Sequence, residues 1–147
     1  MKRFILGFGL LILVAPGAYA DEQQLGRDCD QVERVLISIP NAQYSRDWGV
    51  FQGTDDESVF GGCVIVVTGS RGANNDFESR FYQLYPTDDS EFGKSGWALD
   101  SPEDNKQAFT ITRNGNFCQV SGDWGDGSGS GSSPVFTIRV ECGVKEE

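Results

Sequence analysis

The chain has 147 residues, no histidine and a formal net charge of −10. Without histidine the usual general base is missing, so Ser-His-Asp and Cys-His hydrolases are excluded. The excess of acidic residues argues against nucleic acids and anionic lipids as partners, because phosphates attract clustered lysine and arginine. Basic proteins are the partners that this charge favours.

The first twenty residues have the pattern of a secretory signal peptide. Lys2-Arg3 precedes an apolar run from Phe4 to Val14, and Ala18-Tyr19-Ala20 forms an A-x-A cleavage site. The run is about 11 residues long, too short for the roughly 20 that cross a bilayer as a helix. Residue 21 is Asp, not the cysteine of a lipoprotein. We expect a periplasmic or secreted protein with no membrane attachment after cleavage, and a single globular domain over residues 21–147.

Four cysteines follow the signal peptide, and an even set in an oxidising compartment indicates two disulfides. They are Cys29, Cys63, Cys118 and Cys142. Four cysteines allow three pairings, and we predict Cys29 with Cys63 and Cys118 with Cys142, since each pair lies on neighbouring core-facing elements. A zinc site is disfavoured because the chain has no C-x-x-C pair and no histidine, so we expect no metal and no cofactor.

The first element of the mature chain is predicted to be an amphipathic helix from Leu25 to about Ile39. Its apolar residues recur at helical spacing, and Pro40-Asn41 ends it. Cys29 lies on the apolar face, so it is expected to point into the core. The face consists of Leu25, Cys29, Val32, Val35, Leu36 and Ile39.

Strands are predicted over the middle of the chain. Trp48–Gln52 is a short strand, and Val59–Thr68 is a central strand because its β-branched run is apolar on both faces. Phe77–Tyr85 fits either a helix or a strand. Its aromatic composition and the proline that follows favour a strand.

Asn114-Gly115 is the clearest turn signal, because a type I′ hairpin needs positive φ at both central residues. It joins Phe109–Arg113 to Asn116–Val120, and Val135–Cys142 alternates as a further antiparallel strand. The predicted fold is α+β: an N-terminal amphipathic helix packed on an antiparallel sheet of about four to six strands, stapled by two disulfides.

A Gly/Ser-rich loop over Gly122–Ser133 carries the candidate binding residues Asp123, Trp124 and Asp126. An aromatic side chain between two acids is suited to anchor in the cleft of a basic protein. The Asp126-Gly-Ser-Gly-Ser-Gly spacing also resembles the first half of a calcium loop. Its twelfth position is Thr137 and not glutamate, so only a weak calcium site stays open.

No coherent catalytic motif is present, and we expect no catalytic residues. Acidic clusters could serve a small carboxylate-dependent glycan hydrolase, but consecutive acids in turns are normally solvated. Tryptophans in turn-like context could instead form a carbohydrate-binding module, although Trp97 is expected in the core. The sequence therefore favours an exported acidic non-catalytic binding protein, of inhibitor or immunity type, for a basic exported protein. The acidic clusters are Asp55-Asp56-Glu57, Asp88-Asp89-Glu91 and Glu103-Asp104.

Overall fold

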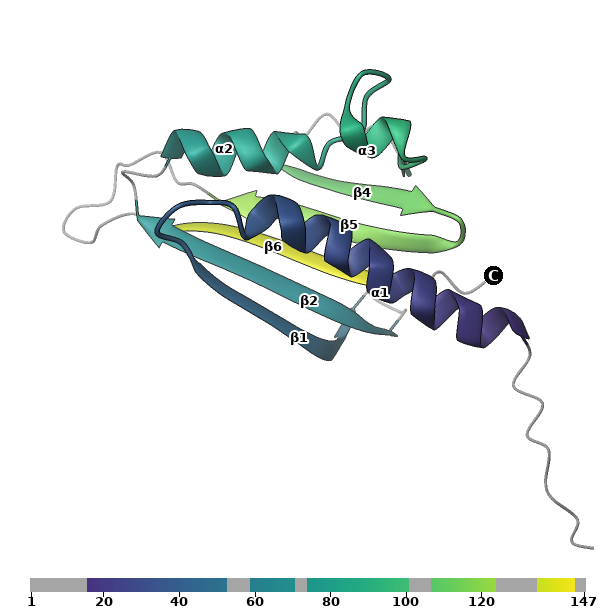
Figure 1. Ribbon diagram of the computed structural model, residues 1–147. Coiled ribbons are helices and arrows are strands. Elements are labelled where there is room, and N and C mark those ends of the chain that lie inside the picture. Colours follow the sequence, from purple (N-terminus) through teal and green to yellow (C-terminus); the bar gives the residue numbers. More distant parts are fainter. Residues whose placement is uncertain (1–15, 53–58, 71–73, 101–106, 124–134, 145–147) are drawn as a thin grey trace, which may run out of the picture.

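The computed structural model describes residues 16–52, 59–70, 74–100, 107–123 and 135–144. Three helices lie on one face of an antiparallel sheet of six strands (Figure 1). The elements in chain order are α1 (Pro16–Leu36), β1 (Gln43–Gln52), β2 (Val59–Ser70), α2 (Asn74–Gln83), α3 (Glu91–Lys94), β3 (Ala98–Leu99), β4 (Ala108–Arg113), β5 (Asn116–Asp123) and β6 (Val135–Val144). No helix within these ranges is long and apolar enough to cross a membrane.

The sheet order is β1-β2-β6-β5-β4-β3, with every neighbouring pair antiparallel. The last strand of the chain thus lies between the β1-β2 and β4-β5 hairpins and joins them. The predicted turn is confirmed: Asn114 and Gly115 have φ of 50° and 81°, and Arg113 pairs with Asn116. The predicted alternation of β6 is also confirmed.

The main core lies between α1, α2 and the covered face of the sheet. Its sheet residues come from alternate positions of the four inner strands, as expected for side chains that share one face. On α1 the predicted apolar positions are buried, apart from the half-buried Val35. The sheet residues are Cys63, Ile65 and Val67, Phe109 and Ile111, Cys118 and Val120, and Phe136, Ile138, Val140 and Cys142.

A small aromatic cluster covers part of the opposite face. Phe51, Phe60 and Phe117 meet there, with 4.7 Å between the ring centroids of Phe60 and Phe117. The rings pass over Gly143, where an ideal Cβ would lie 3.2 Å from Phe51. The sequence predicts that β2 is apolar on both faces, and this cluster is the apolar packing on its second face.

The strand predicted over Phe77–Tyr85 is wrong, because the chain forms α2 there. Phe77, Phe81 and Leu84 are spaced for one face of a helix, and all three are fully buried. Phe77 packs on Phe136 and against Gly69, whose missing side chain leaves room for the ring. Burial of this face outweighs the local strand composition.

Helix α1 also differs from its predicted bounds. It begins at Pro16, so its first residues belong to the expected leader, and it ends at Leu36. Ile39 follows in a turn but remains buried. Both predicted disulfides are present, Cys29–Cys63 and Cys118–Cys142, and the described residues contain no free cysteine.

Candidate functional site

An apolar groove of about 840 Å³ lies where the N-terminal half of α1 passes over the end of the sheet. We call it the Trp48 groove. Its walls and floor come from four elements: α1, β1, β2 and β6. The residues that line it are Gln23, Leu25, Trp48, Gly49, Val50, Gly61, Gly62 and Val144.

Two large apolar side chains of this groove are open to solvent. Trp48 is 61% exposed and Val50 is 74% exposed. Trp48 pairs with Cys63 and Val50 with Gly61, so both lie on the face of the sheet that carries α1. On a face that is otherwise used for the core, such exposure marks a surface left free for a ligand or partner.

Glycine at position 61 keeps the floor of the groove open. A Cβ built on Gly61 would meet no other atom within 4 Å. A Cβ on the neighbouring Gly62 would lie 1.7 Å from the carbonyl oxygen of Cys142. The two adjacent glycines therefore have different structural roles. The absence of a side chain at Gly61 leaves the floor of the groove empty, and its absence at Gly62 allows β2 and β6 to approach closely.

The groove borders the free edge of the sheet. Strand β1 pairs with β2 over its whole length, from Gln43 with Thr68 to Gln52 with Val59. No described strand pairs with its other side. The part from Trp48 to Gln52 contains no charged residue, whereas charges, prolines and bulges are the features that normally protect an edge strand.

The other half of β1 is tied to α1 by ionic contacts. Arg46 donates to Asp30 at 2.7 Å and also to Glu33, and these bonds raise the pKa of the Arg46 guanidinium. Tyr44 lies beside Glu33, and burial together with that carboxylate raises the pKa of its hydroxyl. These contacts position α1 next to the groove.

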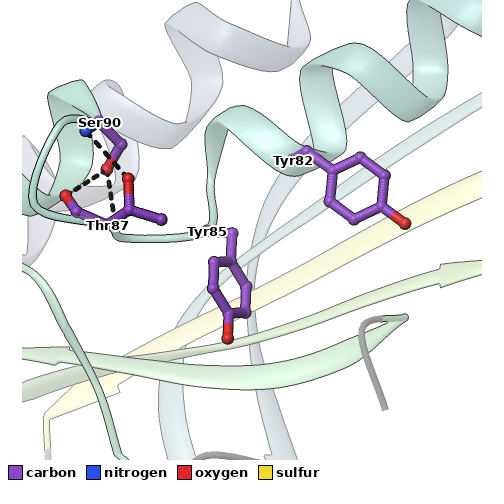
Figure 2. Close-up of a pocket in the computed structure, with 4 residues that line it drawn as sticks. All are labelled: Tyr82, Tyr85, Thr87 and Ser90. Carbon is purple, nitrogen blue, oxygen red and sulfur yellow. Dashed lines mark hydrogen bonds between the residues drawn. The ribbon is translucent and has the colours of Figure 1, made fainter. Parts of the chain in front are cut away.

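A second cavity of about 560 Å³ is lined by Tyr82, Tyr85, Thr87 and Ser90 (Figure 2). The Ser90 hydroxyl accepts from the backbone N–H groups of Thr87 and Gly93 and donates to the Thr87 carbonyl. The Thr87 hydroxyl accepts from the Ser90 N–H. Both hydroxyls thus cap α3 and its preceding turn, which leaves the tyrosines as the groups that could contact a ligand.

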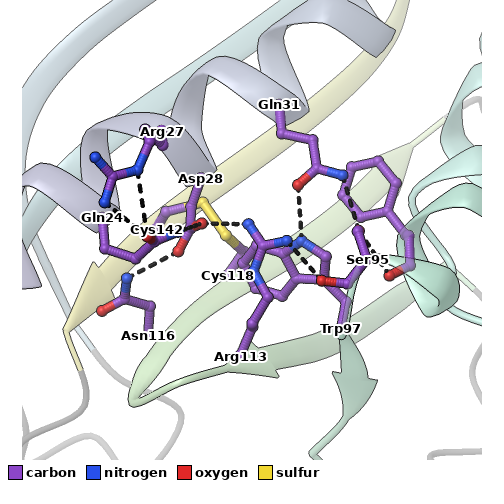
Figure 3. Close-up of polar contacts among 11 residues, drawn as sticks. Gln24, Arg27, Asp28, Gln31, Ser95, Trp97, Arg113, Asn116, Cys118 and Cys142 are labelled. Carbon is purple, nitrogen blue, oxygen red and sulfur yellow. Dashed lines mark hydrogen bonds and ion pairs between the residues drawn. A yellow bond between two sulfur atoms is a disulfide. The ribbon is translucent and has the colours of Figure 1, made fainter.

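The one buried carboxylate among the described side chains is Asp28 of α1 (Figure 3). Its Oδ1 accepts from Arg113 and from Gln24 at 2.8 Å, and its Oδ2 accepts from Asn116 at 2.8 Å. Each oxygen of this buried carboxylate thus accepts at least one hydrogen bond, as buried polar groups normally do. It links α1 to the β4-β5 hairpin, and this structural role explains its burial.

The same network continues to Trp97, whose predicted core position is confirmed. The indole is 3% exposed and donates to Gln31 at 3.1 Å. The Arg113 guanidinium carbon lies 4.5 Å from the centroid of the Trp97 ring, a cation–π contact. Ser95 completes the network by accepting from Gln31 and from Arg113 (Figure 3).

Of the three predicted binding residues, the structure describes Asp123 alone. Asp123 is the exposed last residue of β5 and pairs with Thr137, whereas Trp124 and Asp126 fall outside the described residues. At the other end of the same eight-residue strand, Asn116 pairs with Val144 of the groove. Asp123 is therefore about 24 Å along β5 from the residue that pairs with Val144, at roughly 3.4 Å per residue.

The acidic clusters gain no support from their positions. Asp88, Asp89 and Glu91 are exposed around the start of α3. The other two clusters, over residues 55–57 and 103–104, lie outside the described residues, as does the candidate calcium loop after Asp123. Acidic side chains that are exposed in this way are typical of an ordinary solvated surface.

Sequence reasoning found Trp48 but not the groove. The sequence predicts Trp48 and Val50 only as parts of a short strand. Gly61-Gly62 inside a predicted central strand was the available signal, because glycine in a strand often marks a close approach.

Comparison with known proteins adds no assignment, since no family model, curated protein or solved structure matches the chain.

Proposed function

We propose that this protein is an exported, acidic, non-catalytic binding protein of inhibitor or immunity type, and that it docks a basic exported protein at the Trp48 groove. The observation that carries the proposal is the exposure of Trp48 and Val50 beside an apolar groove of about 840 Å³. Aromatic anchors seated against pockets supply much of the affinity in protein interfaces.

The edge of β1 suggests how the partner docks. An extended partner segment could pair with the uncharged part of β1, Trp48–Gln52, and place alternate side chains over the groove. Main-chain hydrogen bonds would then provide affinity, and Trp48 with Val50 would select the apolar side chains. This mode uses the two features that the groove combines, a strand edge that no other described strand covers and an exposed tryptophan.

Charge supports a basic partner. Signal-peptide cleavage changes the net charge from −10 to −12, because Lys2 and Arg3 are lost. Asp47, next to Trp48, is exposed. Long-range attraction of this sign raises the association rate and weakens with salt, whereas the apolar contacts control dissociation.

The loop with Asp123, Trp124 and Asp126 is the alternative docking surface. It remains a prediction of the sequence, and it shares no residue with the groove, so the two surfaces can be tested by separate substitutions. A carbohydrate-binding module is the second candidate function. It is favoured by the Tyr82 and Tyr85 cavity, because tyrosine rings stack on sugars. The Thr87 and Ser90 hydroxyls count against this function, because both are already hydrogen-bonded to backbone groups of the protein.

The test is a pull-down from periplasmic or secreted extract at low and high salt, followed by affinity measurement with the captured protein. Trp48→Ala should weaken binding about 30-fold, or about 2 kcal/mol. Gly61→Val should block the groove with no loss of stability, because the added side chain enters empty space. Ile37→Ala is the matched control, since Ile37 is 58% exposed and directly follows the C-terminal end of α1, away from the groove.

The outcomes separate the candidates. A partner that tolerates both groove variants but is lost with Trp124→Ala places the interface on the loop and overturns the groove. Absence of a protein partner together with retention on insoluble glycans, lost in Tyr82→Ala, favours the carbohydrate module. Glycan turnover lost on substitution of an acidic residue identifies a hydrolase.

A further inference from the structure

The two disulfides lie side by side in the core. Cys142 pairs directly with Cys63 of β2 on one side and with Cys118 of β5 on the other. The sulfur atoms of Cys29, Cys63 and Cys142 all lie within 4.8 Å of one another. The sulfur of Cys118 is outside this group of three, although it is bonded to Cys142.

This placement gives the two members of the cross-strand disulfide different chemistry. Thiol–disulfide exchange needs a thiolate that can reach a sulfur of another disulfide. Cys142 meets that condition within the folded protein, and Cys118 lies farther away. Once Cys142 is a thiolate, it lies within 4.8 Å of both sulfurs of the Cys29–Cys63 bond, so it can reach that bond without any further opening of the fold.

We propose that Cys142 is an internal exchange residue that can transfer its bond to Cys63 and release Cys29. An external dithiol first reduces Cys118–Cys142 and itself becomes a disulfide. The Cys142 thiolate then attacks the sulfur of Cys63. The Cys63–Cys142 bond forms, the Cys29–Cys63 bond breaks, and Cys29 leaves as a thiolate. The second step consumes one disulfide and forms one, so it needs no further oxidant or reductant.

Attack at Cys63 is favoured over attack at Cys29 by the sheet register. Cys63 and Cys142 are directly opposed on paired antiparallel strands, and Cys118 is opposed to Cys142 on the other side of β6. The new bond therefore needs no change of strand pairing. Attack at Cys29 would join α1 to β6 instead.

The exchange would remove the covalent tie between α1 and the sheet. Leu25, which lines the Trp48 groove, is one helical turn before Cys29. Loss of the tie would loosen that wall of the groove, and this consequence alone rests on the proposed function. The exchange itself depends only on the positions of the sulfurs.

The direct test uses exported Cys118→Ala, which leaves Cys142 without its partner. After acid quenching and alkylation, peptide mapping should find two species: Cys29–Cys63 with Cys142 alkylated, and Cys63–Cys142 with Cys29 alkylated. Interconversion should be faster at higher pH because the thiolate is the nucleophile. The matched control is Cys142→Ala, in which Cys118 should stay free and only Cys29–Cys63 should be found.

A Cys118→Ala protein with all alkylation at Cys142, at every pH, overturns the proposal. Equal exchange in the two variants also overturns it, since that result indicates scrambling in an unfolded chain. A Cys29–Cys142 bond would show that Cys142 attacks the sulfur of Cys29 and not that of Cys63, which would contradict the proposal. If Cys118→Ala does not fold, the wild-type protein treated briefly with a limiting dithiol should give Cys63–Cys142 with Cys29 and Cys118 alkylated. Labelling confined to Cys118 and Cys142 would refute it.

Discussion

Asp28 of α1 and Arg113 of β4, 85 residues apart in the chain, form an ion pair in which the aspartate is completely buried. Asn116 and Gln24 provide the other hydrogen bonds of the carboxylate. The pair holds the helix against the β4-β5 hairpin at a point where no disulfide joins them. Removing one partner leaves the other charge unpaired in a region of low dielectric.

Asp28→Ala should therefore reduce the free energy of unfolding by about 3–5 kcal/mol. Denaturant unfolding followed by tryptophan fluorescence provides the measurement. Asp30→Ala is the control, because its salt bridge with Arg46 is 59% exposed on the aspartate side and should contribute less than about 1 kcal/mol. Equal losses for the two variants would contradict a special role for Asp28.

The adjacent glycines of β2 should respond in opposite directions to the same substitution. Gly62→Ala should destabilise the protein by about 3 kcal/mol, at the upper end for overpacking, because its Cβ would meet the backbone of β6. Gly61→Ala should stabilise it by about 0.5–1 kcal/mol, since alanine loses less conformational entropy in a strand. Melting curves of the two variants test this, and a stable Gly62→Ala protein would contradict the close approach.

Tyr44 should make the fold sensitive to alkaline pH. Its pKa in the folded protein is raised by burial, so the folded state holds the phenolic proton more tightly than the unfolded chain. The resulting stability is complete below a pH of about 10, the usual tyrosine pKa, and is lost as the pH rises above it. The free energy of unfolding of the wild type should fall between a pH of about 8 and a pH of about 11. In Tyr44→Phe this fall should be smaller, because the substituted residue has no phenolic proton to lose.

Docking along the edge of β1 predicts a pattern of amide exchange. Alternate N–H groups of an edge strand point away from its neighbour and exchange readily. In complex with a captured partner, the outward N–H groups within Trp48–Gln52 should exchange at least about tenfold more slowly. Slowing confined to α1, with the β1 amides unchanged, would indicate docking on the helix alone.

Local sequence determined several parts of this protein. Asn114-Gly115 specified its hairpin and register, because few residues accept two successive positive φ angles. The alternation in Val135–Cys142 specified which side of β6 enters the core, and with the helix pattern around Cys29 it brought the right cysteines together. These features depend on neighbours a few residues apart, which a sequence displays directly.

Other parts were decided only by tertiary packing. Phe77–Tyr85 is compatible with two structures, and burial against Phe136 and Phe109 selected the helix. Nothing local places β6 between β2 and β5, so neither the neighbouring sulfurs of Cys63 and Cys142 nor the Asp28–Arg113 pair could be predicted. The Trp48 groove likewise exists because α1 crosses the end of the sheet without covering Trp48 and Val50. Periodicity reports which face of an element is apolar, whereas the partner of that face depends on contacts between residues far apart in the chain.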